Sequence, residues 1–144
     1  MATKAFSQFL HDKYDKPARD AVTAYVKMKW GLDCKPNEDQ YAVDLVVYRS
    51  GVPTGYIEVE VRNWNICSYQ TIHIAHRKEK LLRNDLPTLF FALTADLSHA
   101  YWANSSVIQN SPLIEVRNFE VPEGEMFYDC PIKEFKYVDL TEPF

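Results

Sequence analysis

Hydrophobic and polar positions follow a helical period in the first part of the chain. Between residues 17 and 30 (PARDAVTAYVKMKW) apolar residues recur every three or four positions, as on one face of a helix. The apolar stripe contains Ala21, Val22, Tyr25, Val26 and Met28. Pro17 suits a first helical turn and Gly31 suits the end of a helix. We therefore expect a helix over residues 17–30.

The next two segments show the period of two that is typical of β-strands. Residues 41–48 (YAVDLVVY) and 56–62 (YIEVEVR) are rich in β-branched and aromatic residues. The segment between them, RSGVPTG, has the glycine and proline content of a turn. We expect an antiparallel hairpin whose paired positions have numbers that sum to about 102–104, which places Asp44 opposite Glu58 to Glu60.

The following segment predicts a second helix. When residues 69–83 (YQTIHIAHRKEKLLR) are placed at 100° per residue, histidines and basic residues gather on one side, and Lys78 lies among the apolar residues on the other. Residues 88–94 (TLFFALT) form the continuous apolar run of a buried strand, and residues 99–103 (HAYWA) predict the strand after it. The chain from residue 112 onward predicts short strands and turns.

Length and composition narrow the class of protein. A chain of 144 residues that is 47% hydrophobic fits one domain, 1–144, with a core at about 17–103 and a C-terminal extension at 104–144. The first residues lack the apolar run of a signal peptide, no stretch of 18 apolar residues occurs, and the three cysteines form no CxxC pair. We therefore expect a cytoplasmic protein without a membrane partner. The net charge of −4 favours no partner, but residues 62–83 carry five basic residues against one acid, which suits local contact with a polyanion.

Three carboxylates are expected on one face of the predicted hairpin. Glu58 and Glu60 alternate with apolar residues, so they share a strand face about 7 Å apart, and Asp44 lies opposite them. Converging carboxylates repel unless a cation lies between them, and Mg²⁺ prefers oxygen ligands and often binds beside a phosphate. The alternative is a solvated strand face with salt bridges to Arg62 or Lys78.

This arrangement resembles the motif of the PD-(D/E)XK nuclease superfamily, which has the restriction-endonuclease-like fold. The family carries Asp on one strand and (D/E)-x-K on the next; here Asp44 matches the first acid and Glu58 the second. Glu60 stands where the family usually has lysine, although some restriction enzymes of this fold have Glu there and still cut. The order of elements matches over about residues 17–103, and Asp20 on the first helix matches an auxiliary acid of some members.

The resemblance implies an α/β fold with a central mixed β-sheet flanked by helices, and a nuclease that hydrolyses phosphodiester bonds with Mg²⁺ or Mn²⁺. In that interpretation Asp44 and Glu58 hold the metal, Glu60 orients or deprotonates the attacking water, and Lys78 supplies the missing lysine. The nucleic acid, which we expect to be DNA, would lie against basic and histidine side chains: Arg62, His73, His76, Lys80 and Arg83. Many relatives dimerise to cut both strands, so a homodimer is also expected.

Two other functions fit the sequence. The first is a catalytically inactive member of the same fold that binds nucleic acid or protein, since Glu60 replaces the lysine and the net charge is negative. The second is a zinc site in which Cys67, His73 and His76 supply three ligands and Cys34 or Cys130 supplies the fourth. No glycine-rich phosphate loop occurs, and Ser98–His99 lacks the flanking glycines of a serine-hydrolase nucleophile.

Overall fold

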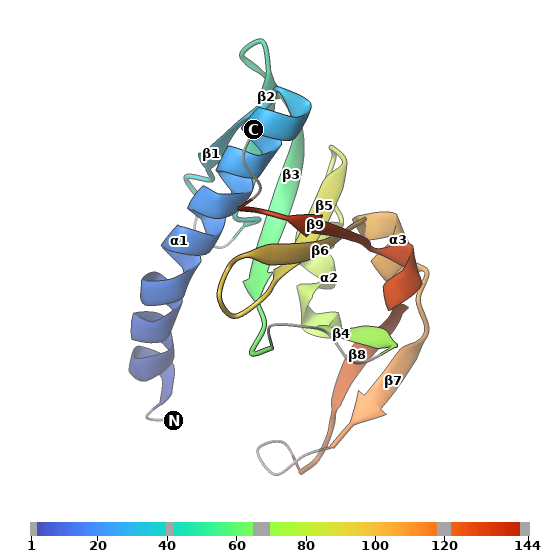
Figure 1. The fold of residues 1–144 in the computed structure, drawn as a ribbon. Helices are drawn as coiled ribbons and strands as arrows, with labels where there is room; N and C mark the ends of the chain where they lie inside the picture. Colours follow the sequence, from blue (N-terminus) through green and yellow to red (C-terminus); the bar gives the residue numbers. More distant parts are fainter. Residues whose placement is uncertain (1–2, 40–41, 65–69, 118–121, 142–144) are drawn as a thin grey trace.

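The computed structural model describes residues 3–39, 42–64, 70–117 and 122–141, with side chains from Lys16 onward. The larger sheet has the strand order β1-β2-β3-β5-β6-β9 and the smaller sheet the order β4-β8-β7 (Figure 1). The strands of the larger sheet are β1 (Asp33–Pro36), β2 (Leu45–Arg49), β3 (Val52–Val61), β5 (Thr88–Leu93), β6 (His99–Asn104) and β9 (Lys136–Asp139). Those of the smaller sheet are β4 (Thr71–Ala75), β7 (Leu113–Val116) and β8 (Glu125–Pro131). The helices are α1 (Thr3–Trp30), α2 (Glu79–Leu82) and α3 (Ser105–Gln109), with 3₁₀ turns η1 (His76–Lys78) and η2 (Ile132–Glu134).

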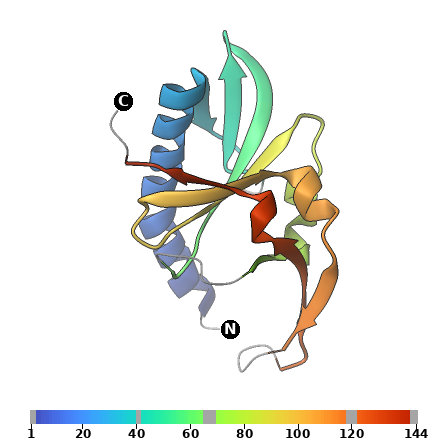
Figure 2. The same cartoon turned by 45° about the vertical axis from the view of Figure 1, so that its right-hand side comes forward.

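The larger sheet separates two hydrophobic cores. Helix α1 covers one face, and the smaller sheet with α2 and α3 packs against the other (Figure 2). The first core contains Val22 and Val26 of α1 with Ile57 and Val59 of β3. Because successive strand residues point to opposite faces, Glu58 lies on the face of the second core. The larger sheet is mixed, since β3 and β5 are parallel while its other pairs are antiparallel. The prediction of a mixed α/β fold is therefore confirmed.

Helix α1 confirms the predicted helix and extends it toward the N-terminus. Pro17 lies inside the helix rather than in its first turn. Val22, Tyr25 and Val26 are buried as expected, but Met28 is 52% exposed, so its place in the apolar stripe was wrong. The helix ends as predicted at Gly31, whose φ of +69° is the left-handed conformation that favours glycine.

The β2–β3 hairpin confirms the predicted pairing. Leu45 pairs with Ile57 and Val46 with Tyr56, so the position numbers sum to 102 over this part of the ladder. β2 begins at Leu45, later than expected, and Asp44 directly precedes it. Ser50 and Gly51 form the turn with φ values of 52° and 78°, as a two-residue turn with positive φ at both positions requires.

The segment expected as a second helix is instead a strand followed by short helical turns. In β4 the buried Ile72 and Ile74 alternate with the exposed His73, which is the period of a strand. Its hydrogen-bonding partner is β8, which follows more than fifty residues later in the chain. Lys78 ends the 3₁₀ turn η1 and directly precedes α2.

The later strands agree with the prediction, and the C-terminal residues complete both sheets. β5 and β6 correspond to the two apolar segments predicted as strands. β9 is the edge strand beside β6, and β8 is the central strand of the smaller sheet. The described residues after Asn104 therefore contribute strands to both sheets. Within the described part of the chain, no helix is both long enough and apolar enough to span a membrane.

Gly55 of β3 allows a close approach of the backbone before β5. A Cβ atom on Gly55 would lie 2.9 Å from the carbonyl oxygen of Pro87, and that oxygen accepts a 2.9 Å hydrogen bond from Tyr56 N. We expect Gly55→Ala to lower the free energy of unfolding by about 1 kcal/mol, because the backbone of β3 must move away from the segment before β5. Urea denaturation measures the effect. An unchanged or increased stability would contradict this account, since alanine in an unstrained strand position is normally favoured over glycine.

Candidate functional site

Asp44 and Glu58 are brought together by the hairpin. Asp44 continues the register that pairs Leu45 with Ile57, so it lies opposite Glu58, as predicted. Its Oδ2 accepts a 2.8 Å hydrogen bond from the backbone N–H of Val59. This bond fixes the Asp44 carboxylate against β3, on the same face of the sheet as Glu58.

Glu58 is a buried carboxyl group with an unusual environment. Its residue is only 5% exposed, and its Oε2 lies 3.4 Å from the Nζ of Lys78. Its Oε1 is buried and has no hydrogen-bond partner among the described residues. Burial, together with the negative charge of Asp44, raises the pKa of Glu58 to about 8 despite the opposing effect of Lys78. The raised pKa favours the protonated form of Glu58, and a proton there reduces the repulsion between Glu58 and Asp44.

Glu60 is bound by two cations and does not join the other two acids. Its carboxylate forms ion pairs with Lys78 Nζ at 2.6 Å and Arg62 Nη2 at 2.9 Å. Burial alone would raise the pKa of Glu60, but the charges of Arg62 and Lys78 outweigh it and hold the pKa below its ordinary value. The three acids lie on one face of the sheet as predicted, but Glu60 pairs with Arg62 and Lys78, as in the alternative of a salt-bridged strand face. No group of three His, Cys, Asp or Glu side chains suited to a metal ion occurs among the described residues.

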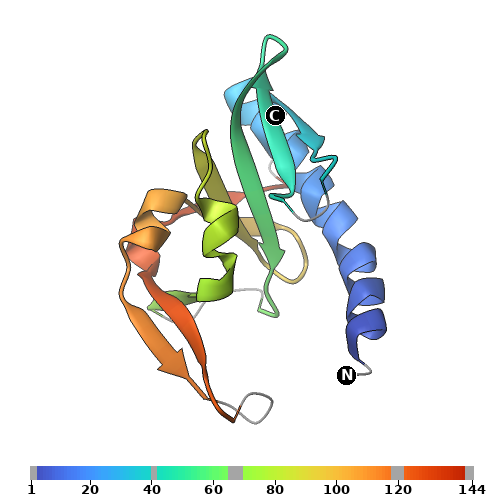
Figure 3. The same cartoon turned by 180° about the vertical axis from the view of Figure 1, so that it is seen from behind.

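Lys78 reaches both acidic strand residues from a different element than expected. It lies at the junction of η1 and α2, on the side of the larger sheet opposite α1 (Figure 3). Its Nζ contacts Glu58 and Glu60 and lies 5.8 Å from the ring centroid of Phe90. Burial opposes the charge of Lys78, but the negative charge of Glu60 raises the pKa of Lys78 above its ordinary value. The site thus consists of the acid pair Asp44 and Glu58 and of Lys78, whose ammonium group contacts both Glu58 and Glu60.

The basic face expected on a second helix is not formed, because the segment begins as strand β4 and only its last residues are helical. Arg62 pairs with Glu60 and donates a 2.7 Å hydrogen bond to the backbone oxygen of His73. The other side chains mostly face acids from β8 and α2: His73 Nε2 lies 3.1 Å from Asp129 Oδ1, His76 Nε2 lies 2.9 Å from Glu79 Oε2, and Arg83 pairs with Glu79. Lys80 is exposed. Asp129 is distant from these side chains in sequence, and Glu79 is one acid against five basic residues. The local excess of basic residues therefore predicted a more positive surface than the fold presents.

The predicted auxiliary acid lies on the wrong side of the sheet. Asp20 belongs to α1, which packs on the face that contains Ile57 and Val59. Its side chain is 65% exposed and pairs with Lys16 at 3.0 Å. The sheet separates Asp20 from Glu58, so it cannot share a ligand with that carboxyl group.

The structure gives no support to the zinc alternative. Cys34 belongs to the first core and Cys130 to the second, on opposite faces of the larger sheet. Burial raises the pKa of each thiol to about 11, which disfavours the thiolate that binds zinc. His73 and His76 are separated between β4 and η1, and each faces its own acid. Cys67 lies outside the described residues.

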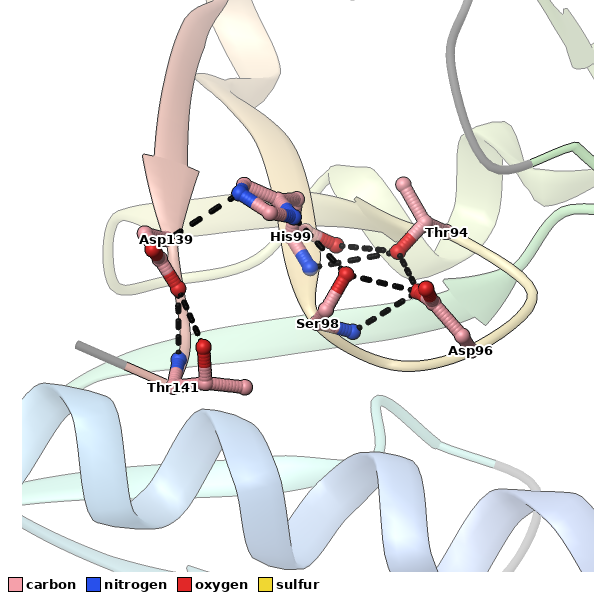
Figure 4. Close-up of polar contacts among 6 residues, drawn as sticks. All are labelled: Thr94, Asp96, Ser98, His99, Asp139 and Thr141. Atoms are coloured by element: carbon pink, nitrogen blue, oxygen red, sulfur yellow. Dashed lines mark hydrogen bonds and ion pairs between the residues drawn. The ribbon is translucent and has the colours of Figure 1, made fainter.

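A polar network closes the loop between β5 and β6 (Figure 4). Asp96 Oδ1 accepts hydrogen bonds from Ser98 Oγ at 2.7 Å, Ser98 N at 3.0 Å and Thr94 Oγ1 at 2.8 Å, and these bonds lower the pKa of Asp96 to about 2. Ser98 Oγ also lies 2.7 Å from His99 Nδ1. Because Ser98 donates its single proton to Asp96, it is held in a turn rather than activated by His99.

The structure also gathers four ring side chains that the sequence did not indicate as a group. Trp64, Tyr101, Tyr137 and His99 form consecutive ring contacts on the face of the larger sheet that carries Glu60. The alternation in HAYWA and KYVD indicates which residues of each strand share a face. It does not show that the two strands are neighbours, and the pairing of β6 with β9 is what brings Tyr101 and Tyr137 together.

We compared the chain with known proteins: no protein-family model matches it, and no curated protein matches it.

Proposed function

We propose that this chain is a metal-dependent nuclease whose centre consists of Asp44, Glu58 and Lys78. The observation that carries the proposal is the position of the Lys78 ammonium, 3.4 Å from Glu58 and 2.6 Å from Glu60. A lysine from the segment after β4 thereby stands beside the second acid, where the PD-(D/E)XK motif would place its own lysine at position 60. The hairpin that pairs Asp44 with Glu58 in a mixed sheet also supports the restriction-endonuclease-like interpretation.

The acid pair has the character of a site for a hard divalent cation. Glu58 Oε1 is buried without a partner among the described residues, and the charge of Asp44 contributes to the raised pKa of Glu58. Carboxylate oxygens are the ligands that Mg²⁺ and Mn²⁺ prefer, and a small set of them with several waters is sufficient beside a phosphate. Asp44 and Glu58 would hold the ion, which supplies positive charge that activates water and stabilises the phosphate in the transition state.

The other residues act through charge and position. The Lys78 ammonium has donors for an attacking water or a phosphate oxygen, and its contact with Glu60 fixes its direction. Glu60 is best assigned as a positioning residue, because its lowered pKa makes it a weak base and keeps its ion pairs with Lys78 and Arg62 intact. Arg62, whose side chain is 19% exposed, lies where it can also contact phosphate.

The test combines metal-dependent stability with cleavage. We expect Mg²⁺ or Mn²⁺ to raise the melting temperature of the wild-type chain by about 2–5 °C over EDTA, and to permit cleavage of labelled nucleic acid. Asp44→Asn should lose both effects, because one of the two metal ligands loses its charge. DNA and RNA substrates, single- and double-stranded, are assayed on the same samples.

A matched control is Asp20→Asn, which changes an exposed acid on the opposite face of the sheet. This variant should retain both the metal-dependent stabilisation and the cleavage. If metal stabilised the wild type and Asp44→Asn equally, and neither cut, the nuclease proposal would fail.

One observation favours the alternative of an inactive binding module with the same fold. Glu60 already forms ion pairs with both Lys78 and Arg62, so these cations are less available to a phosphate than free side chains would be. A binding module would show nucleic-acid or protein binding without any metal-dependent cleavage. The cleavage assay separates the two functions directly.

A further inference from the structure

A row of four rings crosses one edge of the larger sheet. The ring centroids of Trp64 and Tyr101 lie 5.7 Å apart, those of Tyr101 and Tyr137 4.6 Å, and those of Tyr137 and His99 5.1 Å. Each ring thus contacts the next, and we call these four residues the aromatic row.

The aromatic row lies on the same face as the carboxylate–lysine site and in register with it. Glu60 pairs with Ala92, Ala92 with Tyr101, and Tyr101 with Tyr137. Directly paired residues share a face, and neighbouring strands are about 4.8 Å apart, so the Cα atoms of Tyr101 and Tyr137 lie about 10 and 14 Å from that of Glu60. A single extended strand of nucleic acid can span this distance.

The end of the aromatic row at His99 is held in place. His99 Nδ1 lies 2.7 Å from Ser98 Oγ and its Nε2 lies 3.7 Å from Asp139 Oδ2, so both ring nitrogens face polar groups (Figure 4). The ring stacks on Tyr137 with an interplanar angle of 5°. Ordered rings lose little conformational entropy when another flat ring is added to the stack.

Tyr137 presents a large aromatic surface to solvent. It is 50% exposed, whereas Val138, the next residue of the same strand, packs against the first core. The strand therefore has its apolar contacts on one face and offers aromatic surface on the other. Tyrosine and histidine rings are well suited to stack on nucleobases, which all have a flat π-face.

We propose that the aromatic row is a stacking platform for the bases of single-stranded nucleic acid, which leads that strand toward the carboxylate–lysine site. Unpaired bases have free faces, whereas those of a duplex are already stacked on one another, so the row selects single strands or unpaired ends. The direction of the strand toward the acid pair rests on the proposed nuclease function. The stacking itself does not.

The test measures binding of a fluorescein-labelled oligo-dT by anisotropy, in EDTA so that no cleavage occurs. Tyr137→Leu should weaken binding about 5- to 100-fold, the range that removal of one stacking aromatic produces. Because stacking and not charge is removed, the fold-change should be similar at low and high salt. Tyr137→Phe keeps the ring and should bind like the wild type.

A matched control is Tyr48→Leu, the same substitution on β2 beside Lys35, away from the aromatic row. It should leave binding unchanged, and melting curves of all variants show whether the Tyr137 effect exceeds any loss of stability. The proposal is overturned if wild-type protein does not bind the oligonucleotide, if Tyr137→Leu binds it normally, or if both tyrosine variants lose affinity equally. An equal loss of affinity for duplex DNA also overturns it.

The outcomes separate this proposal from the nuclease function. Binding that depends on Tyr137, without cleavage in Mg²⁺ or Mn²⁺, supports the platform and contradicts the nuclease. Cleavage that Tyr137→Leu leaves unchanged for single-stranded and duplex substrates supports the nuclease and contradicts the platform.

Discussion

Replacing Lys78 with methionine is expected to lower the free energy of unfolding by about 2–3 kcal/mol at pH 8 and to abolish cleavage. The ammonium group contacts Glu58 and Glu60, and its side chain is only 21% exposed. Removal of one partner from a buried ion pair leaves charge uncompensated, which costs several kcal/mol. The cost is reduced here because Glu58 can take up a proton and Glu60 keeps its ion pair with Arg62. Urea denaturation and the cleavage assay measure the two effects.

Two further variants separate charge from stability. Lys80→Met makes the same substitution two residues later, at an exposed side chain, and should change the stability by less than about 0.5 kcal/mol. Lys78→Arg keeps the positive charge and should retain most of the stability, but its planar group cannot place a donor where the ammonium lies, so cleavage should fall. A stable Lys78→Met protein with normal cleavage would show that Lys78 is not part of the site.

The relation between Asp44 and Glu58 could be predicted because a hairpin is a local structure. A turn near Gly51 and strands with alternating residues determine which positions pair, and the observed sum of 102 lies within the predicted range. The shared face of Glu58 and Glu60 follows from the strand period alone. These features depend on residues that are close in sequence.

The region of Lys78 could not be predicted as well, because its structure depends on a distant partner. Ile72 and Ile74 alternate with His73 over only five residues, and the same letters also fit a helical stripe. In the folded chain, the pairing of β4 with β8 makes this segment a strand. The contact of Lys78 with the acids was nevertheless anticipated, because a long side chain on the buried side of either a helix or a turn can reach the sheet.

The charges at the site were the least predictable feature. Three acids on one face were expected to need one cation at their centre, but Glu60 turns to Arg62 and Lys78 and leaves Asp44 and Glu58 as a separate pair. The alternative of salt bridges to Arg62 or Lys78 named the cations that Glu60 contacts, but the sequence alone does not show which of the two arrangements forms. Because only Glu60 pairs with two cations, the pKa of Glu58 is raised while that of Glu60, on the same strand, is lowered.

These opposite shifts predict opposite effects of two neighbouring substitutions. Glu58 has a pKa raised from 4.5 to about 8, so the folded state binds its proton more tightly than the unfolded state does. The stability that this proton contributes is complete below about pH 4.5 and is lost as the pH rises through 8. Glutamine has the shape of the neutral acid, so Glu58→Gln should match the wild type near pH 5 and exceed its stability by about 2–4 kcal/mol at pH 9.

Glu60→Gln should have the opposite sign. The pKa of Glu60 is lowered, so its ion pairs stabilise the folded state above its ordinary pKa, and this contribution is lost only as the pH falls through the lowered value. At pH 8 the Glu60 variant should therefore be less stable than the wild type while the Glu58 variant is more stable. Urea denaturation of the three proteins from pH 5 to 9 measures both effects, and the addition of Mg²⁺ at pH 8 should stabilise the wild type but not Glu58→Gln. If Glu58→Gln were instead less stable than the wild type at pH 8, Glu58 would serve as an ion-pair partner of Lys78, and the acid pair would not be a metal site.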